Sequence, residues 1–78
     1  MQELKKFIFS LPLDEREDFA KRCNTTLAYL KKAIYRNHEL GPELSVLIEE
    51  NSRKQVTRQM LHPSSYWKKW PELSETEN

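Results

Sequence analysis

The side chains of this chain best suited to bind a ligand are the cations between positions 20 and 37. This stretch carries five lysine and arginine residues and no acid, although the net charge of the 78 residues is only +1. A second segment without acids, residues 51–71, also carries five cations. Positive side chains on one helix face suit the phosphates and base edges of DNA. We therefore expect a nucleic-acid site around residues 20–37; the alternative is that these clusters are only solvated helix faces.

No set of residues suited to catalysis or to metal binding competes with this interpretation. The two histidines, His38 and His62, fall in separate expected loops, and neither has a cysteine, an aspartate or a second histidine at metal-ligand spacing. The single cysteine, Cys23, occupies an apolar position of an expected helix, where the role of a small buried hydrophobe is commoner. The sequence also lacks a glycine-rich phosphate-binding loop. We expect a protein that is not an enzyme and that needs no cofactor or metal.

The composition indicates a small all-α domain. One glycine and four prolines among 78 residues favour helices over hairpins. A hydrophobic content of 37% fills one compact core with little to spare, so dimerisation would help to bury more surface. We expect residues 1–73 to form this domain and residues 74–78 to be a disordered acidic tail. The chain shows no signal peptide and no long apolar run, so we expect a cytoplasmic protein without a membrane partner.

Start and stop signals divide residues 1–73 into a compact bundle of about five short helices. The first helix covers residues 2–10 and ends before Pro12. Asp14 is expected to cap the second helix, with Glu17 three residues later as in a capping box. Thr25 or Thr26 caps the third helix, which runs to about residue 36.

The second half of the chain carries equally clear signals. Gly41, Pro42 and Glu43 begin a fourth helix, which ends near residues 51–52. Thr57 is expected to cap a short helical turn that runs to residue 61. A last short turn of helix carries three aromatic residues, Tyr66, Trp67 and Trp70.

The sharp turn between the second and third helices has the pattern of a helix-turn-helix unit. Such a unit needs a small residue where the helices cross, a residue that tolerates positive φ about four positions later, and apolar residues on the second helix. Ala20, Asn24, Leu30 and Ala33 occupy these places. Asparagine accepts the left-handed backbone that a glycine would otherwise provide. The pattern therefore predicts that residues 26–36 form a recognition helix for the major groove.

The residues of this recognition helix divide into two groups of contacts. Residues near its N-terminus reach base edges, and a lysine one turn later reaches a guanine edge or a phosphate. We assign base-edge contacts to Thr26, Leu27, Ala28 and Lys32. Phosphate contacts, which set the register, are assigned to Thr25, Lys31, Tyr35, Arg36, Asn37 and Arg58. Half-buried packing is the alternative for Tyr35, and the N-terminal ends of the second and fourth helices are further phosphate candidates.

A family resemblance covers residues 4–73. The chain resembles the Cro-like antirepressors and YdaS-type transcriptional regulators of lambdoid phages and prophages in three stretches, RCNTTLAYLKKAI, LGPELSVLIEENS and VTRQMLHPSSYWKKWPEL. The family pattern runs C-G-T-S-x-x-Y-L, a helix with A-I-E, G-x-V-T-R-x-x-L-R-P and then W-P-E-L. Asn24 stands where this pattern has a glycine, and His62 stands where it has an arginine.

The resemblance implies a lambda-repressor-like helix-turn-helix fold, with residues 23–26 as the turn, 26–36 as the recognition helix and 56–58 as the segment after the fourth helix. It implies operator binding and repression in a phage or prophage switch, in the cytoplasm of a bacterial host and near its nucleoid. The partner would be double-stranded operator DNA, bound at a palindrome by a homodimer.

Two alternatives stay open at this point. An antitoxin-like or adaptor module would keep the same fold and bind a small protein partner in place of DNA. Trp67, Trp70 and Leu73 would form either a lid that packs across the first and fourth helices or a dimer surface, and we favour the lid.

Overall fold

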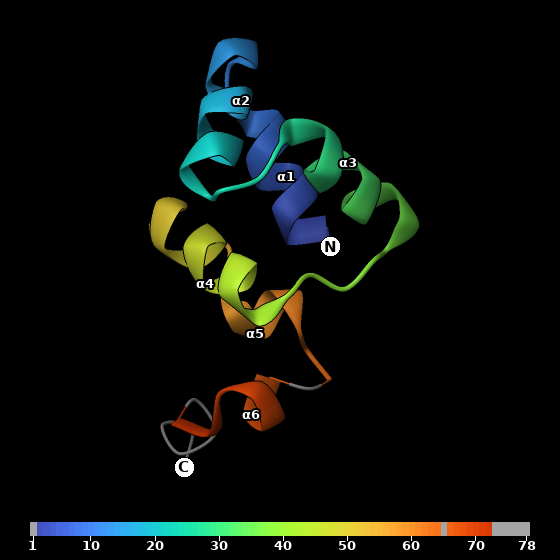
Figure 1. Cartoon of the computed structure of the whole chain (residues 1–78), viewed down its shortest axis with the longest axis vertical. Helices are drawn as coiled ribbons and strands as arrows, with labels where there is room; N and C mark the ends of the chain where they lie inside the picture. The colour runs from blue at the N-terminus through green and yellow to red at the C-terminus, as the bar shows by residue number, and fades with distance from the viewer. Residues whose placement is uncertain (1, 65, 73–78) are drawn as a thin grey trace.

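Helix start and stop residues set the architecture that Figure 1 shows. The computed structural model describes residues 2–64 and 66–72, and in these residues it contains helices and no strand. In chain order the helices are α1 (Gln2–Ser10), α2 (Leu13–Arg22), α3 (Leu27–Arg36), α4 (Pro42–Asn51), α5 (Arg58–Leu61) and α6 (Tyr66–Lys69). The expected all-α bundle is confirmed, with α6 as a short turn of helix at one end of the molecule.

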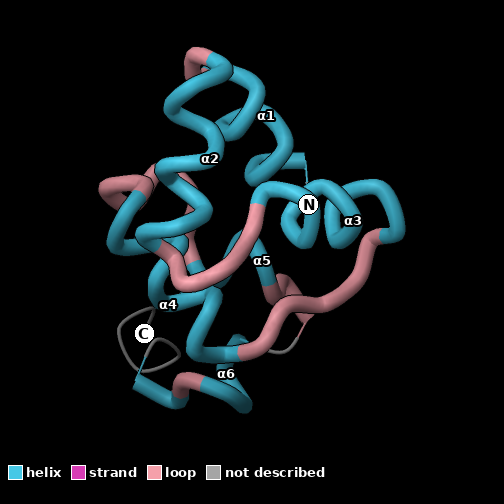
Figure 2. Tube along the Cα trace, turned by 45° about the horizontal axis from the view of Figure 1, so that its top comes forward, coloured by secondary structure: helices cyan, strands magenta, loops and turns pink. Residues whose placement is uncertain are grey.

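The helices enclose one apolar core. Contacts join α1 to α3 and α5, and they join α2 to α3 and α4. In both ribbon views α4 and α5 lie between the group of α1, α2 and α3 and the terminal α6 (Figures 1 and 2). The residues at the centre of the core, which are 0% exposed, are Leu4, Ile8, Phe19, Ala20, Leu30, Ile48 and Val56.

The corner between α1 and α2 differs from the expected capping box. The N-cap of α2 is Pro12, whose extended backbone places its carbonyl 3.2 Å from the N–H of Arg16. Asp14 therefore lies in the first turn of α2 and not at its cap, so the assignment of Asp14 as N-cap is wrong. The guanidinium of Arg16 donates to the carbonyls of Leu11 and Phe9 at 3.0 and 3.2 Å. These bonds satisfy carbonyls at the end of α1 and fix the corner.

The turn between α2 and α3 forms as the sequence predicts. Asn24 has a left-handed backbone with φ of 58°. The N–H of Thr25 donates to the carbonyl of Ala20 at 3.0 Å, which is a bond typical of helices that end in a left-handed residue. Thr26 is then the N-cap of α3, and its hydroxyl oxygen accepts the N–H of Tyr29 at 3.1 Å. Of the two threonines proposed as the cap, the structure selects Thr26.

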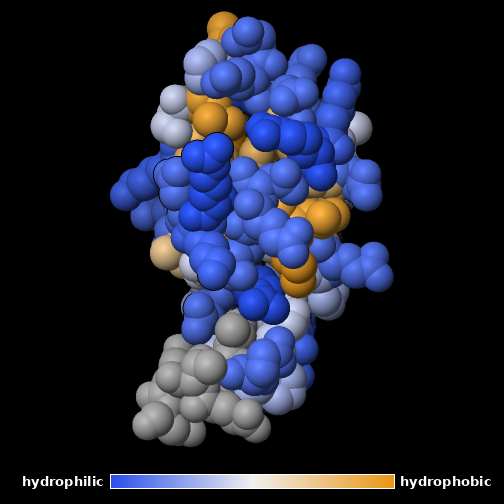
Figure 3. Space-filling model, turned by 90° about the vertical axis from the view of Figure 1, so that its left-hand side faces the viewer, coloured by the Kyte–Doolittle hydropathy of each residue, from blue (hydrophilic) through white to orange (hydrophobic). Residues whose placement is uncertain are grey.

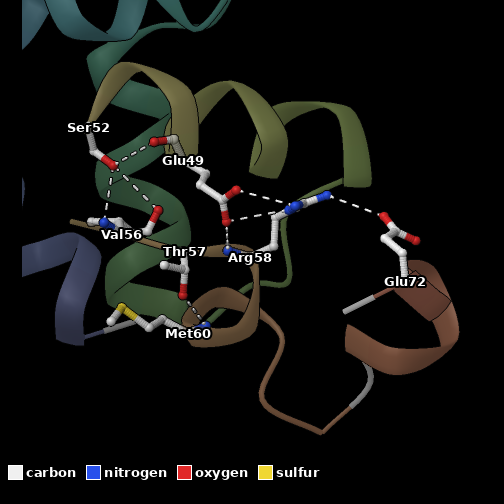
Figure 4. A network of polar contacts seen from close by, with 7 residues as sticks. All are labelled: Glu49, Ser52, Val56, Thr57, Arg58, Met60 and Glu72. Atoms are coloured by element: carbon white, nitrogen blue, oxygen red, sulfur yellow. Dashed lines mark hydrogen bonds and ion pairs between the residues drawn. The ribbon is translucent and has the colours of Figure 1, made fainter. Parts of the chain in front are cut away.

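The connection between α4 and α5 contains two consecutive left-handed residues. Arg53 and Lys54 have φ values of 56° and 65°, a conformation that disfavours residues with a Cβ atom. The buried hydroxyl of Ser52 holds the connection in place, because its oxygen accepts the N–H of Val56 at 3.1 Å. The same hydroxyl lies 3.2 Å from the carbonyl of Glu49, to which it donates (Figure 4). This local network offsets the strain of the connection.

The remaining expected helix starts are confirmed. Gly41 is the N-cap of α4, and Pro42 occupies the first turn of that helix. Thr57 caps α5 by accepting the N–H of Met60 at 3.2 Å, as Figure 4 shows. The second half of the chain thus follows the local signals of its sequence.

Only one of the two tryptophans acts as a lid. Trp70 is 8% exposed, and its ring lies 5.3 Å from the ring of His62 and 5.3 Å from the guanidinium of Arg58. Trp67 is 43% exposed, so the expectation that it also covers the core is wrong. The ring contacts of Trp70 join it to Arg58 of α5 and to His62, the residue that follows this helix. The third expected lid residue, Leu73, and the expected tail 74–78 lie outside the described residues.

A pair of substitutions at Asn24 tests the left-handed turn. Asn24→Val is expected to lower the free energy of unfolding by about 1–2 kcal/mol, because a β-branched residue tolerates this backbone poorly. Asn24→Gly is expected to leave stability unchanged or to raise it slightly. Urea unfolding followed by circular dichroism measures both variants. Equal stability of the valine and glycine variants would contradict a positive φ at this position.

Candidate nucleic-acid interface

Helix α3 buries one face and exposes the opposite one. Leu30, Ala33 and Ile34 point into the core, as expected. Thr26 caps α3, and the first turn contains no acid. The exposed residues of the helix are Ala28, Tyr29, Lys32, Tyr35 and Arg36, none of which is acidic. The outer face of α3 is therefore cationic and accessible along its length.

Three of the four residues assigned to base edges lie on or next to this outer face. Ala28 and Lys32 are exposed and stand one turn apart, and Thr26 is exposed at the N-terminus. The hydroxyl oxygen of Thr26 accepts the N–H of Tyr29, so its proton is left to donate to a ligand. Leu27 is partly buried and packs against the core, so the structure directs it away from the outer face. We therefore remove Leu27 from the base-edge set.

The residues assigned to phosphates are spread over more than one surface. Arg36 and Asn37 are exposed at the C-terminal end of α3, where Asn37 closes the helix with φ of 50°. Thr25 and Lys31 are partly buried. Tyr35 is 65% exposed, so half-buried packing is the wrong alternative for it. The Nζ of Lys5, on α1, lies 5.6 Å from the centre of the Tyr35 ring.

Arg58 belongs to an internal network and not to the outer face of α3. Its backbone N–H donates to Glu49 Oε1 at 2.9 Å, and its Nη2 lies 3.3 Å from Glu49 Oε2. Its Nη1 lies 3.7 Å from Glu72 Oε1, and Figure 4 shows the guanidinium between the two carboxylates. The side chains of Arg58 and Glu49 are only 18% and 15% exposed. The assignment of Arg58 to a phosphate is therefore corrected, because two acids already neutralise its charge.

The sequence interpretation missed one exposed residue of α3. Tyr29 is 38% exposed and lines a shallow groove of about 360 Å³ between the turn of residues 23–25 and the start of α4. Lys31, which the interpretation counted among the outward residues, is partly buried. Tyr29 and Lys31 stand on either side of Leu30, each turned from it by about 100°, so a helical wheel places both at the margins of the buried face and does not separate them.

The N-terminal ends of α2 and α4 are poorer phosphate sites than expected. Asp14 and Glu15 lie in the first turn of α2, and Glu43 lies in the first turn of α4. Carboxylates at these positions interact favourably with the positive end of the helix dipole. They also repel phosphate, so we do not retain these helix ends as contacts.

A hydrogen-bonded chain of three side chains was not foreseen from the sequence. Ser45 Oγ lies 2.8 Å from His62 Nε2, and His62 Nδ1 lies 2.8 Å from Glu39 Oε1. Glu39 Oε1 also lies 3.2 Å from the Nζ of Lys69 on α6. His62 lies 17 positions from Ser45 and 23 from Glu39 in the sequence, so no spacing rule brings these side chains together.

This chain has the residue order of a serine nucleophile, a histidine base and an orienting acid, but its burial opposes that chemistry. Ser45 is 0% exposed and His62 is 2% exposed, so a substrate has no access to the hydroxyl. Ser45 Oγ also lies 2.9 Å from the carbonyl of Gly41 within α4. The three side chains instead connect the α3–α4 loop to α4 and to the C-terminal α6.

Burial and hydrogen bonding shift the pKa values of two groups. Burial raises the pKa of the Cys23 thiol to about 11, so the thiol stays protonated at neutral pH. This agrees with the role of a small buried hydrophobe. Hydrogen bonds from His62 and then from Lys69 hold the pKa of the Glu39 carboxyl below its ordinary value of 4.5.

Other kinds of site find no support in the described part of the chain. Within residues 2–64 and 66–72, no three His, Cys, Asp or Glu side chains gather as a metal site would require. No helix in the same ranges is long and apolar enough to cross a membrane. Searches of protein-family models, curated proteins and solved structures find no match to this chain.

The lowered pKa of Glu39 makes stability depend on pH. Its ionised form is favoured in the folded state, so its contribution is present above pH 4.5 and is lost as the pH falls through the folded-state pKa. Glu39→Gln is expected to flatten this part of the acid unfolding profile. Urea unfolding at a series of acidic pH values measures the effect, with Glu50→Gln as the control for an exposed acid on α4. A Glu39→Gln profile parallel to the wild type would contradict the Glu39–His62 contact.

The internal role of Arg58 predicts a cost in stability. Arg58→Ala leaves the partly buried Glu49 without its ion pair and is expected to lower the free energy of unfolding by about 1–3 kcal/mol. Arg36→Ala, which removes an exposed arginine, is expected to cost less than about 0.5 kcal/mol. Thermal and urea unfolding compare the two variants. Equal stabilities would show that the Arg58 network contributes nothing.

Proposed function

We propose that this protein is a sequence-specific DNA-binding transcriptional regulator that inserts α3 into the major groove of an operator. One observation carries the proposal: α3 follows a left-handed helix-turn-helix turn at Asn24 and exposes a cationic face without acids. A helix of this kind fits the width of the major groove. The resemblance to Cro-like and YdaS-type regulators supports a repressor of a phage or prophage switch.

The exposed residues of α3 have the chemistry that base recognition requires. Lys32 can donate to the O6 and N7 acceptors of a guanine, and the Ala28 methyl can contact a thymine methyl. The free hydroxyl proton of Thr26 can donate at the N-terminal edge, where Tyr29 provides a second hydroxyl. Arg36 and Asn37 are placed for phosphates at the other end of the helix.

A homodimer on a palindromic site is the assembly that suits this recognition mode. Half-sites about one helical turn apart would match two copies related by a two-fold axis. The expected location is the cytoplasm of a bacterial host, where the protein would associate with the nucleoid.

A protein-interaction module of the antitoxin or adaptor type is the second candidate. The observation in its favour is the start of α2, where Leu13 is 76% exposed beside the acids of the first turn. The view from the side opposite α3 shows apolar areas that are small and separated by hydrophilic side chains (Figure 3). A pull-down that yields a stoichiometric small protein, without any DNA shift, would favour this candidate.

Selection from random DNA tests the proposed function directly. Purified wild-type protein is expected to enrich a palindrome and to bind it with nanomolar affinity. Lys32→Ala is expected to weaken binding to the selected site by about 1–3 kcal/mol and to relax its base preference, while random DNA is affected much less. Lys68→Ala on α6 is the matched control, and it should bind like the wild type. Failure to enrich any sequence, or equal weakening on both kinds of DNA, would overturn the proposal or the base contact of Lys32.

A further inference from the structure

The two flanks of α3 carry opposite charge. On the side that faces α1 lies a basic flank made of Lys5 and Lys6 on α1 and Tyr35 on α3. On the side that faces α4 lies Glu43, across a groove from Tyr29. A helix in the major groove runs between two phosphate strands, so the charge on each flank decides how closely it approaches a strand.

Contacts between α1 and α3 build the basic flank. The Nζ of Lys5 lies 5.6 Å from the centre of the Tyr35 ring, within the range of a cation–π interaction. Lys5 and Tyr35 line a recess of about 240 Å³ together with Gln2, Ile34 and Asn37. The ring thus places a lysine of α1 directly beside the recognition helix. Figure 2 shows the two helices side by side, as their contacts require.

The basic flank continues along α1. Lys5 and Lys6 are both exposed, and they line a second recess of about 360 Å³ together with Gln2 and Phe9. Neither recess is lined by an acidic residue. The cationic surface therefore reaches beyond α3 onto a helix that the sequence interpretation did not assign to DNA.

The opposite flank has the reverse character. Glu43 is exposed and lines the groove of Tyr29, Asn24 and Thr25. Glu39, which follows α3, is held by His62 and Lys69, whereas Glu43 has no ion pair among the described residues. Its negative charge therefore acts on any phosphate that approaches this side.

From this asymmetry we infer that α3 docks one-sidedly: the basic flank on α1 holds the phosphates of one strand, and Glu43 keeps the other strand at a distance. This inference rests on the proposed function and adds Lys5 and Lys6 to the DNA surface. It also predicts effects of opposite sign, because loss of a cation on the basic flank weakens binding and loss of the Glu43 charge strengthens it.

The salt dependence of binding measures these contacts. The probes are the operator obtained by selection and a random-sequence duplex of about two helical turns. Each phosphate contact contributes about 0.9 to the slope of log K against log salt concentration. Lys5→Ala is expected to reduce the slope by about that amount on both duplexes, without a change in base preference. Tyr35→Ala should reproduce part of the loss, whereas Tyr35→Phe keeps the ring beside Lys5 and should lose less of the slope than Tyr35→Ala.

The acid is tested in parallel. Glu43→Gln is expected to strengthen binding several-fold at low salt, and the gain should fade as salt screens the charge. Glu50→Gln, on the same helix but at its other end, is the matched control for removal of an acid. Lys68→Ala is the matched control for removal of a lysine. Circular dichroism melts confirm that each variant is folded.

The outcomes separate this inference from the proposed function. Wild-type protein that binds no duplex would overturn both. If the wild type binds and Lys32→Ala loses specificity, but Lys5→Ala keeps the salt slope of Lys68→Ala, the basic flank is overturned and the proposed function stands. A Glu43→Gln variant that binds no better than Glu50→Gln would overturn the one-sided approach.

Discussion

The outer face of α3 depends on the backbone of Asn24. Its left-handed conformation ends α2 and lets the N–H of Thr25 return to the carbonyl of Ala20 at 3.0 Å. Thr26 then caps α3, so the position at which the helix starts is fixed to one residue. Because successive residues of a helix are turned by about 100°, this start also decides which side chains face the core. With a start one residue later, Lys32 would occupy the partly buried position that Lys31 holds here.

Ion pairs and hydrogen bonds between side chains attach the C-terminal part of the described chain to the small apolar core. The apolar core comes from α1 to α5 and the segments between them, whereas Lys69, Trp70 and Glu72, in and after α6, make charged and aromatic contacts. Arg58 joins Glu49 to Glu72, and Lys69 joins α6 to the chain of Glu39, His62 and Ser45. Ion pairs of this partly exposed kind contribute less than apolar packing, so α6 is the element most easily released. None of these ion pairs involves a residue of α3, so the position of its outer face depends on the packing of its buried face in the core.

Local signals account for most of the fold, and long-range contacts account for most of the misassigned site residues. The bounds of α1, α3 and α4 follow from the prolines, the threonine caps and Asn24, all of which act within a few residues. Arg58 looks like a free cation in the sequence, because its partner Glu49 stands nine positions earlier on a different helix. His62 meets Ser45 and Glu39 over separations of 17 and 23 residues, which only the tertiary fold determines. Tyr29 and Lys31 lie at opposite margins of the buried face of α3, so helical phase alone does not decide which of the two is exposed.

A net charge of only +1 is compatible with DNA binding when charges of opposite sign occupy different surfaces. Acids occupy the first turns of α1, α2 and α4, and exposed cations lie on α3 and, as Lys5 and Lys6, on α1. Attraction to phosphates does not depend on the base sequence, so a protein with few cations that lack a nearby acid binds random DNA weakly. For such a protein, base contacts supply a larger share of the free energy of binding to its specific site. In the proposed complex Glu43 would lower the affinity for every duplex alike, so the base contacts proposed for Thr26, Ala28 and Lys32 would supply a larger share of the binding free energy.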